Sequence, residues 1–88
     1  DENVVVFDGK TSLTDVIKVM KLEPETFDEH KSDVESIGGL ATELNGKVPT
    51  IGDIIMFNAL ELKIESADRK KVRRVKLSIV ASNDEDEN

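Results

Sequence analysis

The feature that most constrains the fold is a strict alternation of apolar and polar side chains in residues 60–65 and 74–79. The apolar members of this pattern are Leu60, Leu62, Ile64, Val75, Leu77 and Ile79. Successive side chains of a strand point to opposite faces, so the alternation predicts two antiparallel strands with one face on a core and one in water. We expect a hairpin of about residues 60–66 and 71–80 with Leu62 opposite Leu77 and Ile64 opposite Val75, because a shift of one residue would turn the apolar side chains to water.

Two details of this hairpin follow from the same pattern. On the solvent side, Glu65 is expected to face Arg74. Val72 is out of step with Val75 by one position, which predicts a bulge or the edge of a turn near Arg73.

The first half of the chain carries signals for one strand and two helices. Val4–Phe7 is a β-branched run ended by a turn at Asp8 and Gly9, which predicts a short buried strand. Ser12 can cap a helix that ends before Pro24. The apolar positions of that helix are Leu13, Val16, Ile17 and Met20. A second helix over about residues 36–45 is predicted by Ile37, Leu40, Ala41 and Leu44, with Gly46 as its left-handed C-cap.

With a further strand at residues 54–57, the expected fold class is α+β. The expected order is a strand, two helices and then an antiparallel meander of three strands packed on the helices. We expect residues 1–82 to form one domain and the acidic residues 83–88 to be a disordered tail, since like charges without apolar side chains cannot support a core.

Composition excludes several classes of function. The net charge is −7, with 19 acidic against 12 basic residues, so the chain lacks the basic field that nucleic acids and anionic membranes require. There is no cysteine, and the only aromatic residues besides His30 are three phenylalanines, so neither thiol chemistry nor a row of stacking aromatics is available. No apolar run approaches the roughly 20 residues of a transmembrane helix.

The segment 36–53 resembles the signature of the CorC/HlyC transporter-associated domain. It has a Gly-Gly pair at a helix start, a glycine cap, an apolar-Pro pair and a Gly-Asp turn. The matching positions are Gly38, Gly39, Leu40, Leu44, Gly46, Pro49, Gly52 and Asp53. The opening strand and Ser12-Leu13 upstream, and Arg69, Val72 and Val75 downstream, are similar to the family as well, so that the resemblance covers about residues 4–80.

This resemblance implies a non-catalytic, carboxyl-terminal regulatory or assembly module of a membrane protein linked to magnesium and cobalt efflux, some members being labelled hemolysins. It implies the CBS pair and the transmembrane domain of the parent protein as partners, and a soluble fragment at the cytoplasmic face of the bacterial inner membrane. We expect no cofactor and no catalytic residue, and a second copy of the domain is a further expected partner. The alternative is a direct sensor that binds a divalent cation or an adenine nucleotide.

The acidic segment 23–35 has two interpretations. Carboxylates such as Asp28, Glu29 and Asp33 could hold a hard cation, because magnesium takes oxygen ligands. A solvated loop is favoured, since the segment lacks the ligand spacing and central glycine of a calcium loop. His30, the only histidine, is expected at the surface of this loop, because it has no partner pattern for zinc or catalysis.

The glycine pair and the basic residues each have two interpretations as well. Gly38 and Gly39 could open an anion site at a helix start, but close backbone packing is favoured, at Gly39 in particular, because acidic residues are its nearest charged neighbours in sequence. Lys71, Arg74 and Lys76 could dock an acidic partner. For that row we favour a solvated strand face whose cations pair with Glu61 and Glu65 on the next strand.

Overall fold

Strands β3 (Leu60–Ala67) and β4 (Val72–Ile79) form the central antiparallel hairpin of the sheet. The computed structural model describes residues 3–30 and 33–80. Leu62 lies opposite Leu77 and Ile64 opposite Val75, which confirms the predicted register. All four side chains are fully buried, so the alternation of the sequence is the alternation between core and solvent.

The hairpin contains two register shifts at its turn end. Ser66 lies opposite Arg74 and Ala67 opposite Val72, so Glu65 and Arg73 have no direct partner across the ladder. The bulge predicted near Arg73 is confirmed. The prediction that Glu65 faces Arg74 is wrong, because the extra residue in β3 moves Ser66 into that position.

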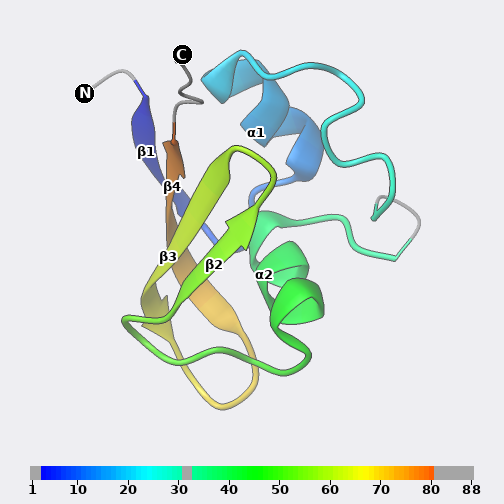
Figure 1. The fold of residues 1–88 in the computed structure, drawn as a ribbon. Helices are drawn as coiled ribbons and strands as arrows, with labels where there is room; N and C mark the ends of the chain where they lie inside the picture. Colours follow the sequence, from blue (N-terminus) through cyan, green and yellow to red (C-terminus); the bar gives the residue numbers. More distant parts are fainter. Residues whose placement is uncertain (1–2, 31–32, 81–88) are drawn as a thin grey trace.

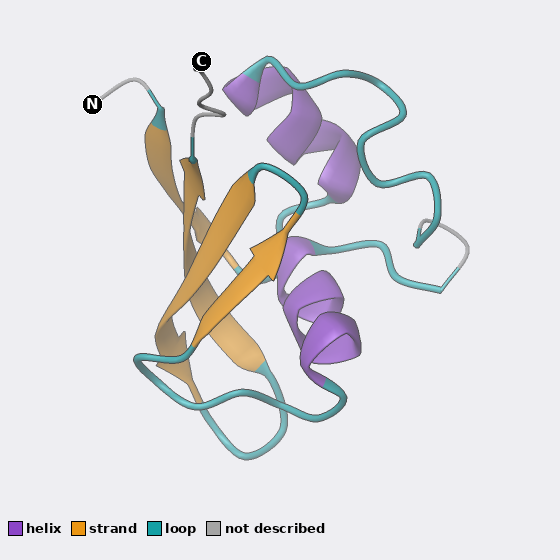
Figure 2. Cartoon of the chain, in the orientation of Figure 1, coloured by secondary structure: helices purple, strands orange, loops and turns teal. Residues whose placement is uncertain are grey.

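Strands β1 (Val4–Asp8) and β2 (Ile54–Phe57) complete a four-stranded antiparallel sheet of order β1-β4-β3-β2. Helices α1 (Leu13–Met20) and α2 (Ile37–Asn45) cover one face of this sheet and leave its other face open (Figures 1 and 2). The expected α+β fold, with a meander of three strands after two helices, is confirmed. The predicted disordered tail at residues 83–88 lies outside the described residues.

The core fills the space between the helices and the sheet and is almost wholly aliphatic. It contains Phe7, Leu13, Val16, Met20, Phe27, Ile37, Leu40, Ala41, Leu60, Leu62, Ile64, Val72, Val75 and Leu77. None of the buried side chains in the described part of the chain is polar or charged. The chemistry available to a ligand or partner therefore lies on the surface.

Both helices begin at a serine cap, and the two starts lie side by side. Ser12 Oγ accepts a hydrogen bond from the Asp15 N–H at 3.1 Å, and Ser36 Oγ accepts one from the Gly39 N–H at 3.0 Å. The two serines face each other in an isolated antiparallel bridge. At the other end of α2, Gly46 is a left-handed C-cap with φ 86°, as predicted.

Candidate functional site

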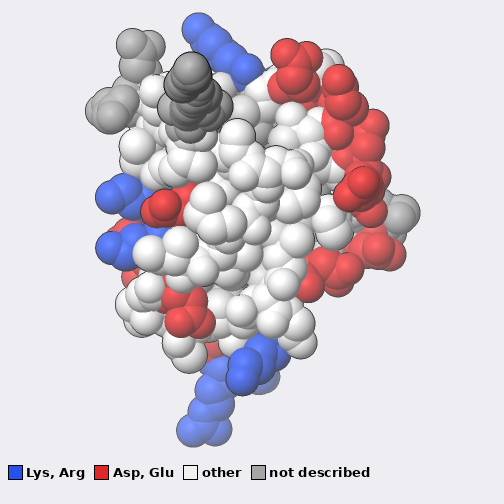
Figure 3. Space-filling model, viewed as in Figure 1, with Lys and Arg blue, Asp and Glu red and all other residues white. Residues whose placement is uncertain are grey.

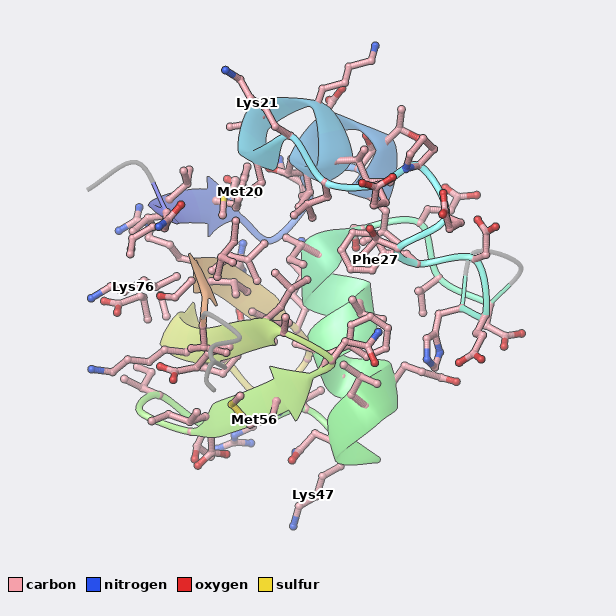
Figure 4. All side chains as sticks on the ribbon, turned by 45° about the horizontal axis from the view of Figure 1, so that its top comes forward. Met20, Lys21, Phe27, Lys47, Met56 and Lys76 are labelled. Atoms are coloured by element: carbon pink, nitrogen blue, oxygen red, sulfur yellow. The ribbon has the colours of Figure 1, made fainter. Side chains whose placement is uncertain are left out.

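The acidic segment between α1 and α2 is held in place by one buried side chain. Phe27 is fully buried, and its ring stacks on Phe57 of β2 with ring centroids 5.8 Å apart. Figure 4 shows Phe27 pointing from the loop toward α2. His30 is half-buried, and its ring meets Phe57 edge-on at 5.4 Å, so the surface position that we expected holds for only part of its side chain.

The carboxylates of this segment lie outside that aromatic contact. Asp28, Glu29 and Asp33 are exposed, and the acidic side chains form a band along the side of the molecule where the segment runs (Figure 3). Within residues 3–30 and 33–80, no group of three or more acidic or histidine side chains is close enough to hold a metal ion. The structure thus places the three metal candidates in the solvated band without bringing them together as a ligand set.

The start of α2 packs against the end of β1 through two glycines. The Gly38 N–H donates to the Gly9 carbonyl at 2.9 Å, and a Cβ on Gly38 would lie 2.8 Å from that oxygen. A Cβ on Gly9 would lie 2.2 Å from the Val72 carbonyl oxygen. The close approach is therefore at Gly38 and Gly9, whereas Gly39, where we expected it, meets only the Ser36 hydroxyl at 3.1 Å and Val34 beyond.

The backbone N–H groups at this helix start are all occupied. The Ile37 N–H donates to Thr11 O at 2.9 Å, and the Leu40 N–H donates to Ser36 O at 2.9 Å. Those of Gly38 and Gly39 bind Gly9 O and Ser36 Oγ, as described above. No unpaired N–H of the first turn is left to bind a phosphate, so packing explains the glycine pair better than an anion cradle does.

An open groove of about 510 Å³ runs beside this junction. Its floor includes Gly38 and Gly39, and three lysines line it: Lys10 from the β1–α1 loop, and Lys70 and Lys71 from the β3–β4 turn. Among the described residues that line the groove, Glu43 of α2 is the only acidic one. The contribution of Lys10 could not be predicted from the sequence, because Lys10 and Lys71 are far apart along the chain and only the fold brings them to one groove.

The basic row predicted on β4 divides between two surfaces. Lys71 and Arg74 line a second hollow of about 210 Å³ that adjoins the groove and shares Lys10 with it. Lys76 lies on the open face of the sheet, away from α2 (Figure 4). Its direct partner on β3 is Lys63, and Glu61 and Glu65 lie two positions away from Lys63 on the same face, so the favoured pairing with these acidic residues stays a prediction for diagonal neighbours.

The β3–β4 turn that carries Lys70 and Lys71 is organised by Asp68. Its Oδ1 accepts hydrogen bonds from the N–H groups of Lys70 and Lys71, both at 2.9 Å, and its Oδ2 accepts one from Arg73 Nε at 2.8 Å. The two backbone bonds, followed by the Arg73 side chain, lower the pKa of Asp68 from 3.8 to about 2. The turn therefore holds both lysines at the rim of the groove.

A family model, the transporter associated domain CorC_HlyC, matches residues 1–81. The chain belongs to this family. The resemblance stated from segment 36–53 is thereby confirmed. No curated protein matches the chain.

Solved structures of transporter-associated domains have the same fold over nearly the whole chain. The domain of a CBS domain protein from Porphyromonas gingivalis is 25% identical, with a TM-score of 0.80 and 91% of this chain and 92% of that one covered. A putative Mg²⁺ and Co²⁺ transporter (CorC) associated region from Neisseria meningitidis is 18% identical, with a TM-score of 0.76 and 91% and 93% covered. The domain of a Xylella fastidiosa hemolysin, in complex with Mg²⁺ and Mn²⁺, is 14% identical, with a TM-score of 0.71 and 92% of each chain covered.

The signature positions of the transporter-associated domain serve the fold. Leu40 and Pro49 are buried, and Leu44 packs against the core. Gly52 has φ 95° in the turn before β2, and Asp53 Oδ2 accepts a hydrogen bond from the Thr50 N–H at 2.9 Å in the same turn. Among the residues described, none of the helices has the length and apolar character needed to span a membrane.

The Gly9–Gly38 contact predicts unequal effects for two neighbouring substitutions. Gly38→Ala should destabilise the domain, because its methyl group would meet backbone atoms that cannot rotate away, and overpacking typically costs about 1–3 kcal/mol. Gly39→Ala is the matched control: its nearest contact is a side-chain hydroxyl, and alanine favours a helix by up to about 1 kcal/mol. Denaturant midpoints of the two variants give the comparison. Equal midpoints would contradict the assignment of the contact to Gly38.

The Asp68 turn predicts a pH dependence of stability. A carboxyl with a lowered pKa stabilises the fold at neutral pH, and that contribution is lost as the pH falls from about 4 to about 2. Asp68→Asn should therefore lower the melting temperature at pH 7, and its difference from the unmodified chain should shrink over that acidic range. A difference that stays constant from pH 7 to about pH 2 would show that the charge of Asp68 contributes nothing.

Proposed function

We propose that this chain is a non-catalytic regulatory or assembly module of a membrane ion transporter that also contains CBS domains. Membership of the transporter-associated family supports this role. The relatives add to it: one is part of a CBS domain protein, and another is the associated region of a putative Mg²⁺ and Co²⁺ transporter. Such a module would act from the cytoplasmic side by contacting other domains of its parent protein.

The observation that carries the contact role is the lysine-lined groove. Lys10, Lys70 and Lys71 gather around one groove, although the chain as a whole has a net charge of −7. Two hydroxyl groups also line the groove: Ser36 Oγ caps α2, and Thr42 Oγ1 donates a hydrogen bond to the Gly38 carbonyl at 3.1 Å. A surface of this kind suits a carboxylate-bearing partner, because opposite charges steer association and fix orientation.

This role predicts how the domain binds the rest of its parent protein. Lys10→Glu combined with Lys71→Glu should weaken binding of the chain, added in trans, to a parent protein that lacks it. We expect a loss of at least about tenfold, equivalent to about 1.4 kcal/mol. Lys18→Glu combined with Lys47→Glu is the control, since both side chains are exposed, the charge change is equal and neither lines the groove. An equal loss of affinity in both double variants would show that net charge alone causes the effect, and it would contradict the proposal.

The alternative function is a direct cation or nucleotide sensor, and the complex of the Xylella fastidiosa domain with Mg²⁺ and Mn²⁺ favours its cation form. Two features of this chain argue against it: the separated carboxylates of segment 23–35 and the occupied N–H groups at the start of α2. Calorimetric titration of the isolated chain with Mg²⁺, Co²⁺ or ATP should accordingly give no saturable isotherm. Saturable binding of any of these ligands at micromolar concentration would contradict the contact role and support the sensor function.

A further inference from the structure

The lysine-lined groove also carries a carboxylate, which a different element contributes. The three lysines lie on the β1–α1 loop and the β3–β4 turn, whereas Glu43 belongs to α2. The side chain of Glu43 is exposed. A groove that accepts carboxylates alone would lose affinity through such a residue, because like charges that meet in a contact repel each other. Whether the domain itself neutralises Glu43 thus decides what the groove can bind.

The sequence around Glu43 gives its carboxylate no partner on α2. On the surface of a helix, a side chain meets those that lie three and four positions away. Two of these positions are Gly39 and Gly46, which have no side chain, and a third is Leu40, which is buried. The fourth is Lys47, which would form a favourable pair with Glu43 if the helix continued.

The end of α2 removes that last partner. Gly46 follows the helix in the left-handed conformation, with φ 86°, so the chain leaves the helical path before Lys47. The Lys47 side chain extends away from the end of α2 (Figure 4). Among the residues that the structure describes, the one ion pair joins Arg73 to Asp68, so none of the described lysines is paired with Glu43.

The ammonium groups of the groove are free in the same sense. Asp68, the carboxylate that organises the turn, binds the backbone N–H groups of Lys70 and Lys71 and not their side chains. Lys10 takes no part in the described ion pair either. The groove therefore presents cations from the loop and the turn, and an anion from α2, without closing them into a pair of its own.

We propose that the groove binds a protein segment of mixed charge, which turns carboxylates toward the three lysines and a lysine or arginine side chain toward Glu43. This assignment rests on the contact role proposed above and specifies the partner. Glu43 is then the residue that sets the specificity of the groove, because a segment with carboxylates alone would place like charge against it. Since the two signs of charge come from different elements, they also select one orientation of the segment.

The direction in which affinity changes when Glu43 loses its charge tests this proposal. Glu43→Gln keeps the size and the helix preference of the side chain. It should weaken binding of the chain, added in trans, to a parent protein that lacks it, by about threefold, as is typical of an exposed charge pair. Glu65→Gln is the control, since it removes the same charge from an exposed residue of β3 outside the groove, and it should bind like the unmodified chain.

The lysine variants separate this proposal from the contact role on which it rests. If Lys10→Glu combined with Lys71→Glu binds normally, the contact role fails and the mixed-charge partner fails with it. If that double variant binds weakly while Glu43→Gln binds as tightly as the unmodified chain, or more tightly, the contact role stands and the mixed-charge partner is overturned. Glu43→Lys should bind more weakly than Glu43→Gln, because it repels the cation of the partner. Tighter binding of Glu43→Lys would show a partner with carboxylates alone.

Discussion

The backbone contact between Gly9 and Gly38 is the constraint on which the rest of the structure depends. Gly9 lies between two elements, with its N–H bonded to Arg73 O at 2.8 Å on β4 and its carbonyl bonded to the Gly38 N–H of α2. A side chain at either glycine would meet backbone atoms closer than 3 Å. One short segment thereby joins the end of β1, the start of β4 and the start of α2 at distances that only glycine allows.

That junction also fixes where both helices begin. The Leu13 N–H donates to Glu35 O and the Ile37 N–H to Thr11 O, both at 2.9 Å, so the two segments that precede the helices run antiparallel beside each other. Each is then capped by its own serine. The same arrangement places Lys10, which lies in the β1–α1 loop, beside the β3–β4 turn. In that turn, Asp68 holds Lys70 and Lys71. The groove is thus a consequence of how the helices start.

Local signals in the sequence were sufficient for the elements and for the central register. Alternation at Leu62 and Leu77, serine and glycine at the ends of α2, and the out-of-step Val72 all act over a few residues, and the structure follows them. What depends on distant contacts was missed. Residue spacing does not show that the close approach lies between Gly9 and Gly38 and not at Gly39, nor that the extra residue at Glu65 moves Arg74 to Ser66.

The candidate site was the least predictable part for the same reason. Sequence neighbours of the glycine pair are acidic, so the pair looked unsuited to any anionic partner, whereas its spatial neighbours are lysines. Similarly, Lys76 was matched with acidic residues of the next strand, but the register sets it opposite Lys63. In a chain with 35% charged residues, the sign of the field at a given point is decided by tertiary placement and cannot be read from composition.

The distribution of charge also limits how this domain can associate. Phe27 anchors the acidic segment on one side, the lysines of the groove lie at the junction of α2 with the sheet, and the β2 edge is uncharged. None of the described residues that line the groove belongs to residues 51–57. An acidic partner in the groove would therefore leave the side chains of the β2 edge uncovered. Because charge interactions at the surface are screened over about 10 Å at 0.1 M salt, a contact made through the lysines of the groove should weaken as salt is added.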